Sequence, residues 1–295
     1  SIHHHLAGHL SMMGFPLTDD LVDILKENFT QEEAKIAMML PATNIPLKPV
    51  TIDELDQSND MDRNHIIDIL EGLVTKNLIF SGKTKTGEKG YALHHAGFGF
   101  PQAFFWEGKN TPDTLKMSRM VLKYFNRKVT EQAFGGEHTK AYRYIPVHRS
   151  VKPEVQAVLP HDRMSEVIDK AQDFAVAHCS CRVQADLMGR PCGHSLEVCL
   201  KFDEMAQYVI DRGLGRRITR EEAVEIVRQA AKEGLVHFVD NASGKVKHNC
   251  NCCGCACWNV GTIRRRKIPR DELMAVYFIR KTDPDRCAGC GECID

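Results

Sequence analysis

The chain lacks an excess of charge of either sign. Its 295 residues include 39 Lys and Arg against 39 Asp and Glu, so no overall field draws it to nucleic acid. It has no apolar leader and no apolar run approaching the roughly 18 residues that cross a bilayer. Phosphate-binding loops and dinucleotide fingerprints are also missing. We therefore expect a cytoplasmic protein without a membrane span, and neither nucleotide hydrolysis nor nicotinamide binding is supported.

Cysteine, in contrast, is abundant and concentrated. Eight of the twelve cysteines lie in the last 46 residues. Cys287, Cys290 and Cys293 have the Cys-x-x-Cys-x-x-Cys spacing of a bacterial ferredoxin loop, and Gly289 and Gly291 allow that loop to curl around a cluster. The triple favours an iron–sulfur cluster over zinc, because zinc loops normally use two separated pairs.

The ferredoxin pattern requires one more cysteine, four residues after the third. The sequence stops at Asp295, before that position. We therefore expect the natural polypeptide to continue beyond this residue.

Nine further cysteines form two groups along the chain: Cys179, Cys181, Cys192 and Cys199, and then Cys250, Cys252, Cys253, Cys255 and Cys257. Nine thiolates could hold two cubanes with one left over, or one cluster beside redox-active or structural thiols. Neighbours in an extended chain point in different directions, so Cys252 and Cys253 could serve different clusters.

Other ligand sets remain open. Zinc or inert buried thiols are alternatives for the first group, and the three possible non-cysteine ligands are His178, His194 and His248. Crowded cysteines in a chain without a leader favour metal over disulfides.

Two basic features accompany the cysteines. Arg182 follows Cys181, and Arg264 begins a four-residue basic run. Either could stabilise the extra negative charge of a reduced cluster. The run could instead dock an acidic partner, or be a solvated surface with no specific role.

The helical and strand patterns predict an α+β protein. We divide it into an N-terminal arm (1–29) with a flexible end, a winged-helix-like domain (30–95), a connecting region (96–160), an α-rich cysteine-ligated domain (161–280) and the start of a ferredoxin-like module (281–295). In the winged-helix-like domain, capping boxes at Thr30 and Thr51 open two helices, and a third is predicted over Asp62–Asn77. Two short strands around a basic loop complete the pattern. The third helix carries too much acidic charge to favour DNA binding.

The cysteine-ligated domain has its own predicted elements. One helix runs from about Asp162 to Ala177, and a second over Arg220–Glu233 is capped by Thr219 and ended by Gly234. A hairpin of Leu235–Val239 and Val246–His248 then leads to Cys250. We hypothesise that helix and hairpin bring the two cysteine groups together.

The chain carries four landmarks: Arg143-x-Ile-Pro146, Cys179-x-Cys181-Arg182, Cys250-Asn-Cys252-Cys253-Gly-Cys255 and the ferredoxin triple. With these motifs it resembles a family of bacterial and archaeal 4Fe-4S ferredoxin-type proteins with an N-terminal winged-helix-like region. The resemblance spans nearly the whole chain. It implies [4Fe-4S] clusters, two or more, and single-electron transfer with a partner oxidoreductase or ferredoxin, with the protein as a complex subunit or an oligomer. Because exposed clusters are sensitive to oxygen, we also expect an anaerobic setting. A redox-sensing winged-helix regulator and a cluster- or thiol-dependent reductase subunit are the alternatives.

Overall fold

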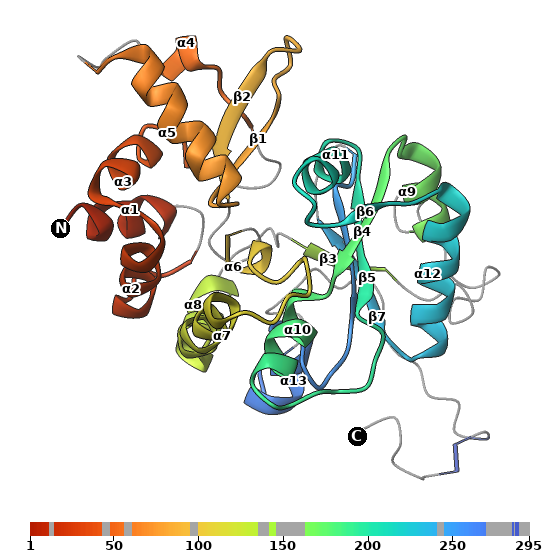
Figure 1. Ribbon diagram of the computed structural model, residues 1–295. Coiled ribbons are helices and arrows are strands. Elements are labelled where there is room, and N and C mark those ends of the chain that lie inside the picture. Colours follow the sequence, from red (N-terminus) through yellow and green to blue (C-terminus); the bar gives the residue numbers. More distant parts are fainter. Residues whose placement is uncertain are drawn as a thin grey trace.

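The computed structural model describes the chain over 1–11, 15–42, 48–55, 61–94, 100–134, 142–145, 163–240, 245–269, 285 and 287–288. Within these residues the protein is a mixed α+β structure, with helices and a two-stranded sheet at the N-terminal end and a six-stranded sheet in the second half (Figure 1). None of the described helices has the length and apolar character needed to cross a bilayer.

The N-terminal segment is helical, so the expectation of a flexible end is wrong. Helix α1 (Ile2–Ser11) buries Leu6 and Leu10, and packs against α2 (Asp19–Asn28) and α3 (Gln31–Ala37). His3, 8% exposed, places Nε2 2.7 Å from the carbonyl oxygen of Phe29. The histidine-rich beginning hides an apolar stripe at helical spacing, and contacts distant in sequence stabilise it.

The next segment follows the sequence pattern closely. The capping box at Thr30 and Glu33 is present. Helices α4 (Ile52–Leu55) and α5 (Arg63–Thr75) precede an antiparallel pair, β1 (Ile79–Lys83) and β2 (Lys89–Leu93). Asn77 takes a positive φ of 59° after α5, which turns the chain from helix to strand.

A set of short helices links this part to the sheet: α6 (Phe100–Ala103), α7 (Pro112–Tyr124) and α8 (Arg127–Phe134). Phe105 and Trp106, which follow α6, are fully or almost fully buried.

The six-stranded antiparallel sheet has the order β3-β7-β8-β5-β4-β6. Its strands are β3 (Tyr142–Ile145), β4 (Phe174–His178), β5 (Glu197–Phe202), β6 (Arg216–Arg217), β7 (Val236–Asp240) and β8 (His248–Cys252). Because β3 pairs with β7, residues 142–145 belong to this sheet and not to a connecting region. The prediction of an α-rich domain missed that a sheet forms its centre.

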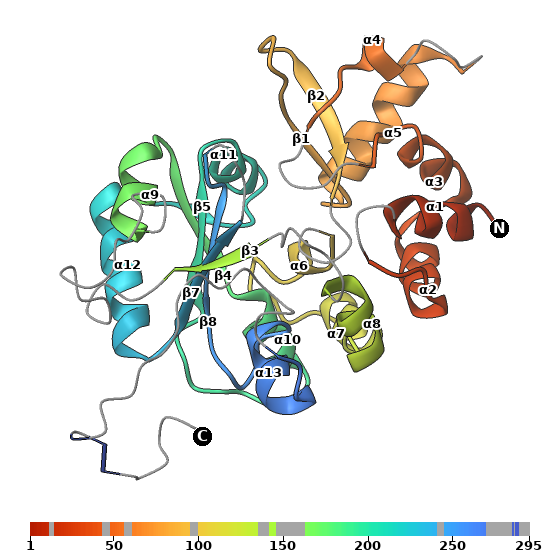
Figure 2. The same ribbon diagram turned by 180° about the vertical axis from the view of Figure 1, so that it is seen from behind.

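Helices cover both faces of the sheet. Helix α12 (Arg220–Lys232) contacts β4, β5 and β7, with α9 (Met164–Lys170) beside it, and α11 (Glu204–Asp211) contacts β4 and β5 from the other face (Figures 1 and 2). Thr219 caps α12 and Gly234 follows it at φ 72°, both as predicted.

The predicted helix from Asp162 to Ala177 is wrong in its second half. Helix α9 ends at Lys170, and Phe174–His178 forms β4. Because β4 is buried on both faces, its apolar run lacks the alternation that marks a half-exposed strand.

Candidate metal centre

The sheet brings cysteines from two distant segments together. Leu200 on β5 pairs with Asn249 on β8, so the next step of the register sets Cys199 opposite Cys250. On β8, Cys250 and Cys252 lie two residues apart and share one face. The second strand of the hairpin therefore pairs with β5 and brings cysteines of the two groups together, but it covers His248–Cys252 and not the predicted Val246–His248.

Two more cysteines lie where β4 passes into α10 (Ser180–Leu187). Cys179 is the N-cap residue of α10, and Cys181 lies in its first turn. The backbone N–H of Trp258 donates to Cys181 Sγ over 3.3 Å, which draws the chain after β8 onto this turn. Cys257, just before it, interacts through its thiol with Cys181 and Cys252.

Six sulfurs thus form one assembly, the six-thiol group of Cys179, Cys181, Cys199, Cys250, Cys252 and Cys257. A cavity of about 20 Å³ lies among them, lined by all of these except Cys257, together with Gln102, Ser180, Val198 and Asn251. Apart from half-buried Cys250, every member of the group is buried.

Two thiols of this group have lowered pKa values, and three have raised ones. Hydrogen bonding to Cys199 and Cys252 holds the pKa of Cys250 well below the usual range, and bonding to Cys181 and Cys252 does the same for Cys257. Burial raises the pKa of Cys181, and the bond with Cys250 raises that of Cys199 and of Cys252. Like charges in a buried space cannot all ionise together. A bound cation would relieve this repulsion, since metals bind cysteine as thiolate.

A second assembly, the four-ligand group, consists of Cys192, His194, Cys253 and Cys255, whose ligand atoms all lie within 4.8 Å of one another. Cys192 and His194 come from the loop between α10 and β5, and the other two from the turn after β8. The pKa of Cys253 is lowered: burial raises it, but the Ala256 N–H and the Arg182 guanidinium outweigh that effect. Burial and the Cys253 thiol raise the pKa of Cys255 to about 12.

Arg182 connects the two assemblies. Its side chain is fully buried, and its guanidinium donates to the carbonyl oxygens of Ser195 and, over 2.9 Å, of Asn251. Burial disfavours its charge, yet the neighbouring sulfurs of Cys179 and Cys253 raise its pKa. A fixed positive charge therefore lies beside both sets of sulfurs.

A buried chain of polar groups leads to Cys250. Lys201, 1% exposed, places Nζ 2.6 Å from Nδ1 of His248 and 4.1 Å from the ring centre of Trp106. His248 Nε2 lies 2.7 Å from Cys250 Sγ. Because an ammonium can only donate, Nδ1 accepts and Nε2–H is directed at the sulfur.

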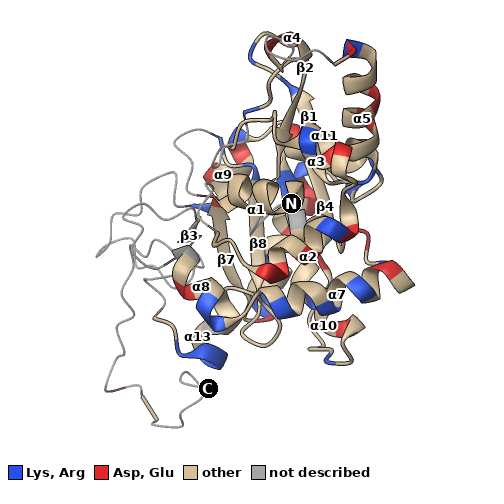
Figure 3. Cartoon of the chain, turned by 90° about the vertical axis from the view of Figure 1, so that its left-hand side faces the viewer, with Lys and Arg blue, Asp and Glu red and all other residues tan. Residues whose placement is uncertain are grey.

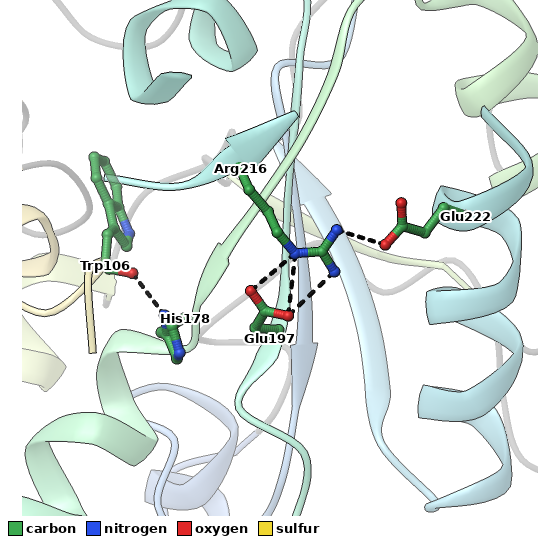
Figure 4. Close-up of polar contacts among 5 residues, drawn as sticks. All are labelled: Trp106, His178, Glu197, Arg216 and Glu222. Carbon is green, nitrogen blue, oxygen red and sulfur yellow. Dashed lines mark hydrogen bonds and ion pairs between the residues drawn. The ribbon is translucent and has the colours of Figure 1, made fainter. Parts of the chain in front are cut away.

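Contacts with residues outside the two cysteine groups position the end of β4 and the start of β5. The Nδ1 atom of His178, a possible ligand by sequence, lies 3.1 Å from the backbone oxygen of Trp106 (Figure 4). In the same view, Arg216 forms ion pairs with Glu197 at the start of β5 and with Glu222 of α12. These contacts hold β4 and β5 where they carry Cys179 and Cys199.

The remaining predicted site residues are Cys287, Cys290, Cys293 and Arg264. Cys287 is exposed, and Cys290 and Cys293 lie outside the described residues. Arg264 is exposed on α13 (Val260–Arg266).

Within the predicted basic run, Arg265 makes contacts that the sequence did not indicate. Arg265 donates to the carbonyl oxygens of Gly254, Cys255 and Cys257. Asn249 and Asn251 were not predicted as site residues either. Both are buried, and they donate to carbonyl oxygens of β7 and β5, respectively. The Asn-Cys-Asn-Cys alternation was an available signal, since period two marks a strand.

Searches of protein-family models, curated proteins and solved structures find no match to this chain. Its function must therefore be argued from the site itself.

Proposed function

We propose that the protein is an iron–sulfur electron-transfer protein, which passes single electrons to or from a partner oxidoreductase. The observation that carries this proposal is the six-thiol group. Its sulfurs come from three parts of the chain; five of the cysteines line one small cavity, and the sixth, Cys257, interacts with two of them. Such a density of thiols on one space fits an iron–sulfur cluster, which would supply one-electron storage when bound.

The surrounding residues have the properties that tune such a site. Backbone N–H groups donate to sulfur at Cys181 and, from Asn259 over 3.4 Å, at Cys257. The buried guanidinium of Arg182 and the Nε2–H of His248 add positive charge and a further donor. Hydrogen bonds and nearby positive charge favour the more negative, reduced form and so raise the potential, whereas burial disfavours the added charge and lowers it.

Further parts of the proposal extend beyond this site. We assign [4Fe-4S] clusters to the six-thiol group and to the ferredoxin triple at 287–293, and a winged helix to residues 30–95. A cytoplasmic location completes the proposal.

The winged helix would serve for protein docking more readily than for DNA. Lys89 pairs with Glu71, Lys76 with Glu33 and Arg63 with Asp53. These ion pairs offset basic charge on α5 and the strand pair, charge that a duplex would otherwise attract. Acidic and basic residues both occur along these elements (Figure 3).

One observation favours a second candidate, a cluster- or thiol-dependent reductase subunit. Half-buried Cys250 has a strongly lowered pKa and a histidine within hydrogen-bonding distance. These are the features of an activated thiol. In that case Cys250 would be the attacking sulfur, and its substitution would abolish disulfide reduction while iron is retained.

Metal analysis of two variants tests the main proposal. Cys199→Ser removes a buried sulfur of the six-thiol group, and Cys255→Ser is the matched control in the four-ligand group. In anaerobically purified protein, we expect Cys199→Ser to lower iron and acid-labile sulfide together at least twofold, with the control unchanged. Unaltered iron and sulfide in both Cys199→Ser and Cys252→Ser would contradict a cluster at this site.

A further inference from the structure

The four-ligand group has the dimensions of a site for one ion. Cys192 Sγ lies 3.9 Å from Cys253 Sγ, and Cys255 Sγ lies 3.8 Å from His194 Nδ1. A tetrahedral zinc ion with sulfur at about 2.3 Å and nitrogen at about 2.05 Å gives edges of about 3.8 Å between two sulfurs and about 3.6 Å between sulfur and nitrogen. The measured separations come close to both edges.

We propose that these four residues bind a single Zn²⁺ ion, separate from the six-thiol group. A cubane attaches each ligand to a different iron atom, which spreads the ligand atoms over a wider space than the 4.8 Å found here. Three cysteines and one histidine are also a common donor set of structural zinc. The assignment does not depend on the proposed electron-transfer function.

The neighbouring residues separate the two sites. Cys252 and Cys253 are adjacent, yet the thiol of Cys252 interacts with those of Cys250 and Cys257, whereas that of Cys253 interacts with Cys255 and Arg182. Two residues joined by one peptide bond, Cys252 and Cys253, therefore belong to two different metal sites. This is the arrangement that opposite side-chain directions at the end of a strand allow.

Outer contacts position the ligands and balance their charge. The Ala256 N–H donates to Cys253 Sγ over 3.4 Å, and Glu233 accepts from the backbone N–H of Ser195, next to His194, over 3.1 Å. Three thiolates around Zn²⁺ carry a net charge of −1, and the guanidinium of Arg182 beside Cys253 compensates it. Partners of this kind orient metal ligands and raise affinity.

The ion would act as a clamp. Cys192 and Cys253 are 61 residues apart in sequence, and one metal would tie the loop after α10 to the turn after β8. Because Cys253 is bonded to Cys252, the clamp also sets the direction in which Cys252 enters the six-thiol group. Zinc thus organises a redox site without exchanging electrons itself.

X-ray absorption at the zinc edge tests this on the intact, anaerobically purified chain and needs no variant. We expect about one zinc per chain, with three sulfur neighbours at about 2.3 Å and one nitrogen neighbour at about 2.0 Å. Absence of zinc, or a shell made of oxygen and nitrogen, would overturn the assignment.

Variants then locate the ion. Cys255→Ser, at an exposed ligand, should lower zinc at least fivefold and leave iron and sulfide unchanged, whereas Cys199→Ser should leave zinc unchanged. Loss of iron and sulfide from Cys255→Ser with zinc retained would refute the zinc site. Failure of the proposed function is distinct, because it would leave zinc in place and iron absent from the wild-type protein.

Discussion

A buried histidine joins the N-terminal part of the protein to the sheet and should make stability depend on pH. His94 follows β2 and is 2% exposed. Its Nε2 lies 2.9 Å from the hydroxyl of Tyr208 on α11, and its ring contacts that of Phe80 edge to face. Burial, together with the charges of Arg212 and Lys201, lowers its pKa from 6.5 to about 3.

The direction of the effect follows from these two pKa values. Between pH 3 and pH 6.5 the unfolded chain binds a proton at His94 that the folded protein excludes. The stabilisation is therefore complete above about pH 6.5 and is lost as the pH falls. Linkage gives a loss of about 2 kcal/mol in the free energy of unfolding between pH 7 and pH 5.

His94→Gln isolates this contribution. The amide can still hydrogen-bond to Tyr208 but cannot gain a proton. Urea unfolding followed by circular dichroism at pH 7, 6 and 5 should show the stability difference between wild type and variant shrinking by about 2 kcal/mol toward pH 5. Effects of acid on bound metal are common to both proteins and cancel in this difference. Parallel pH dependence of the two proteins would refute the argument.

Two further substitutions test how local contacts stabilise the fold. Arg266 donates to the carbonyl oxygens of Phe125 and Asn126 and to Thr130, and these bonds join α13 to the α7–α8 region (Figure 3). Arg266→Met should therefore lower the free energy of unfolding in urea by about 2 kcal/mol. Equal effects from Arg266→Met and from Arg264→Met, at an exposed residue, would contradict this role. Thr30→Ala should remove the α3 cap and cost about 1 kcal/mol, while Thr30→Ser should restore most of it; no difference between the two would mean that the cap contributes nothing.

Local signals predicted much of the fold. Thr30 and Thr219 each mark a helix start because their side chains bond to backbone N–H groups three residues on. Gly234 marks a helix end because it takes a positive φ. These interactions lie within one turn of chain, so residue order alone carries the information.

The structure departs from the sequence predictions where contacts between residues distant in sequence determine the secondary structure. Strand β4 was assigned to a helix because burial on both faces removes the period of two. Helix α1 was missed because its stabilising neighbours, α2 and α3, come later in the chain.

The division of the cysteines is the clearest case. The sequence singled out all nine as candidate ligands and suggested that Cys252 and Cys253 could serve different sites, and in the structure their thiols have different neighbours. Only the sheet register and the α10 turn decide that Cys192 lies with Cys253, while Cys179 and Cys199 lie at the cavity. The spacing of the cysteines along the chain cannot predict this grouping, because the fold brings together cysteines that are distant in sequence.

The central claim is that the six-thiol group holds a cluster that accepts and releases one electron. The most direct test is a redox titration of anaerobically purified protein, followed by low-temperature EPR, in wild type and Cys199→Ser. We predict a signal that appears reversibly with a one-electron dependence on potential in the wild type and is lost or shifted in the variant. A wild-type protein without a reducible iron signal, or a signal identical in both proteins, would contradict the account.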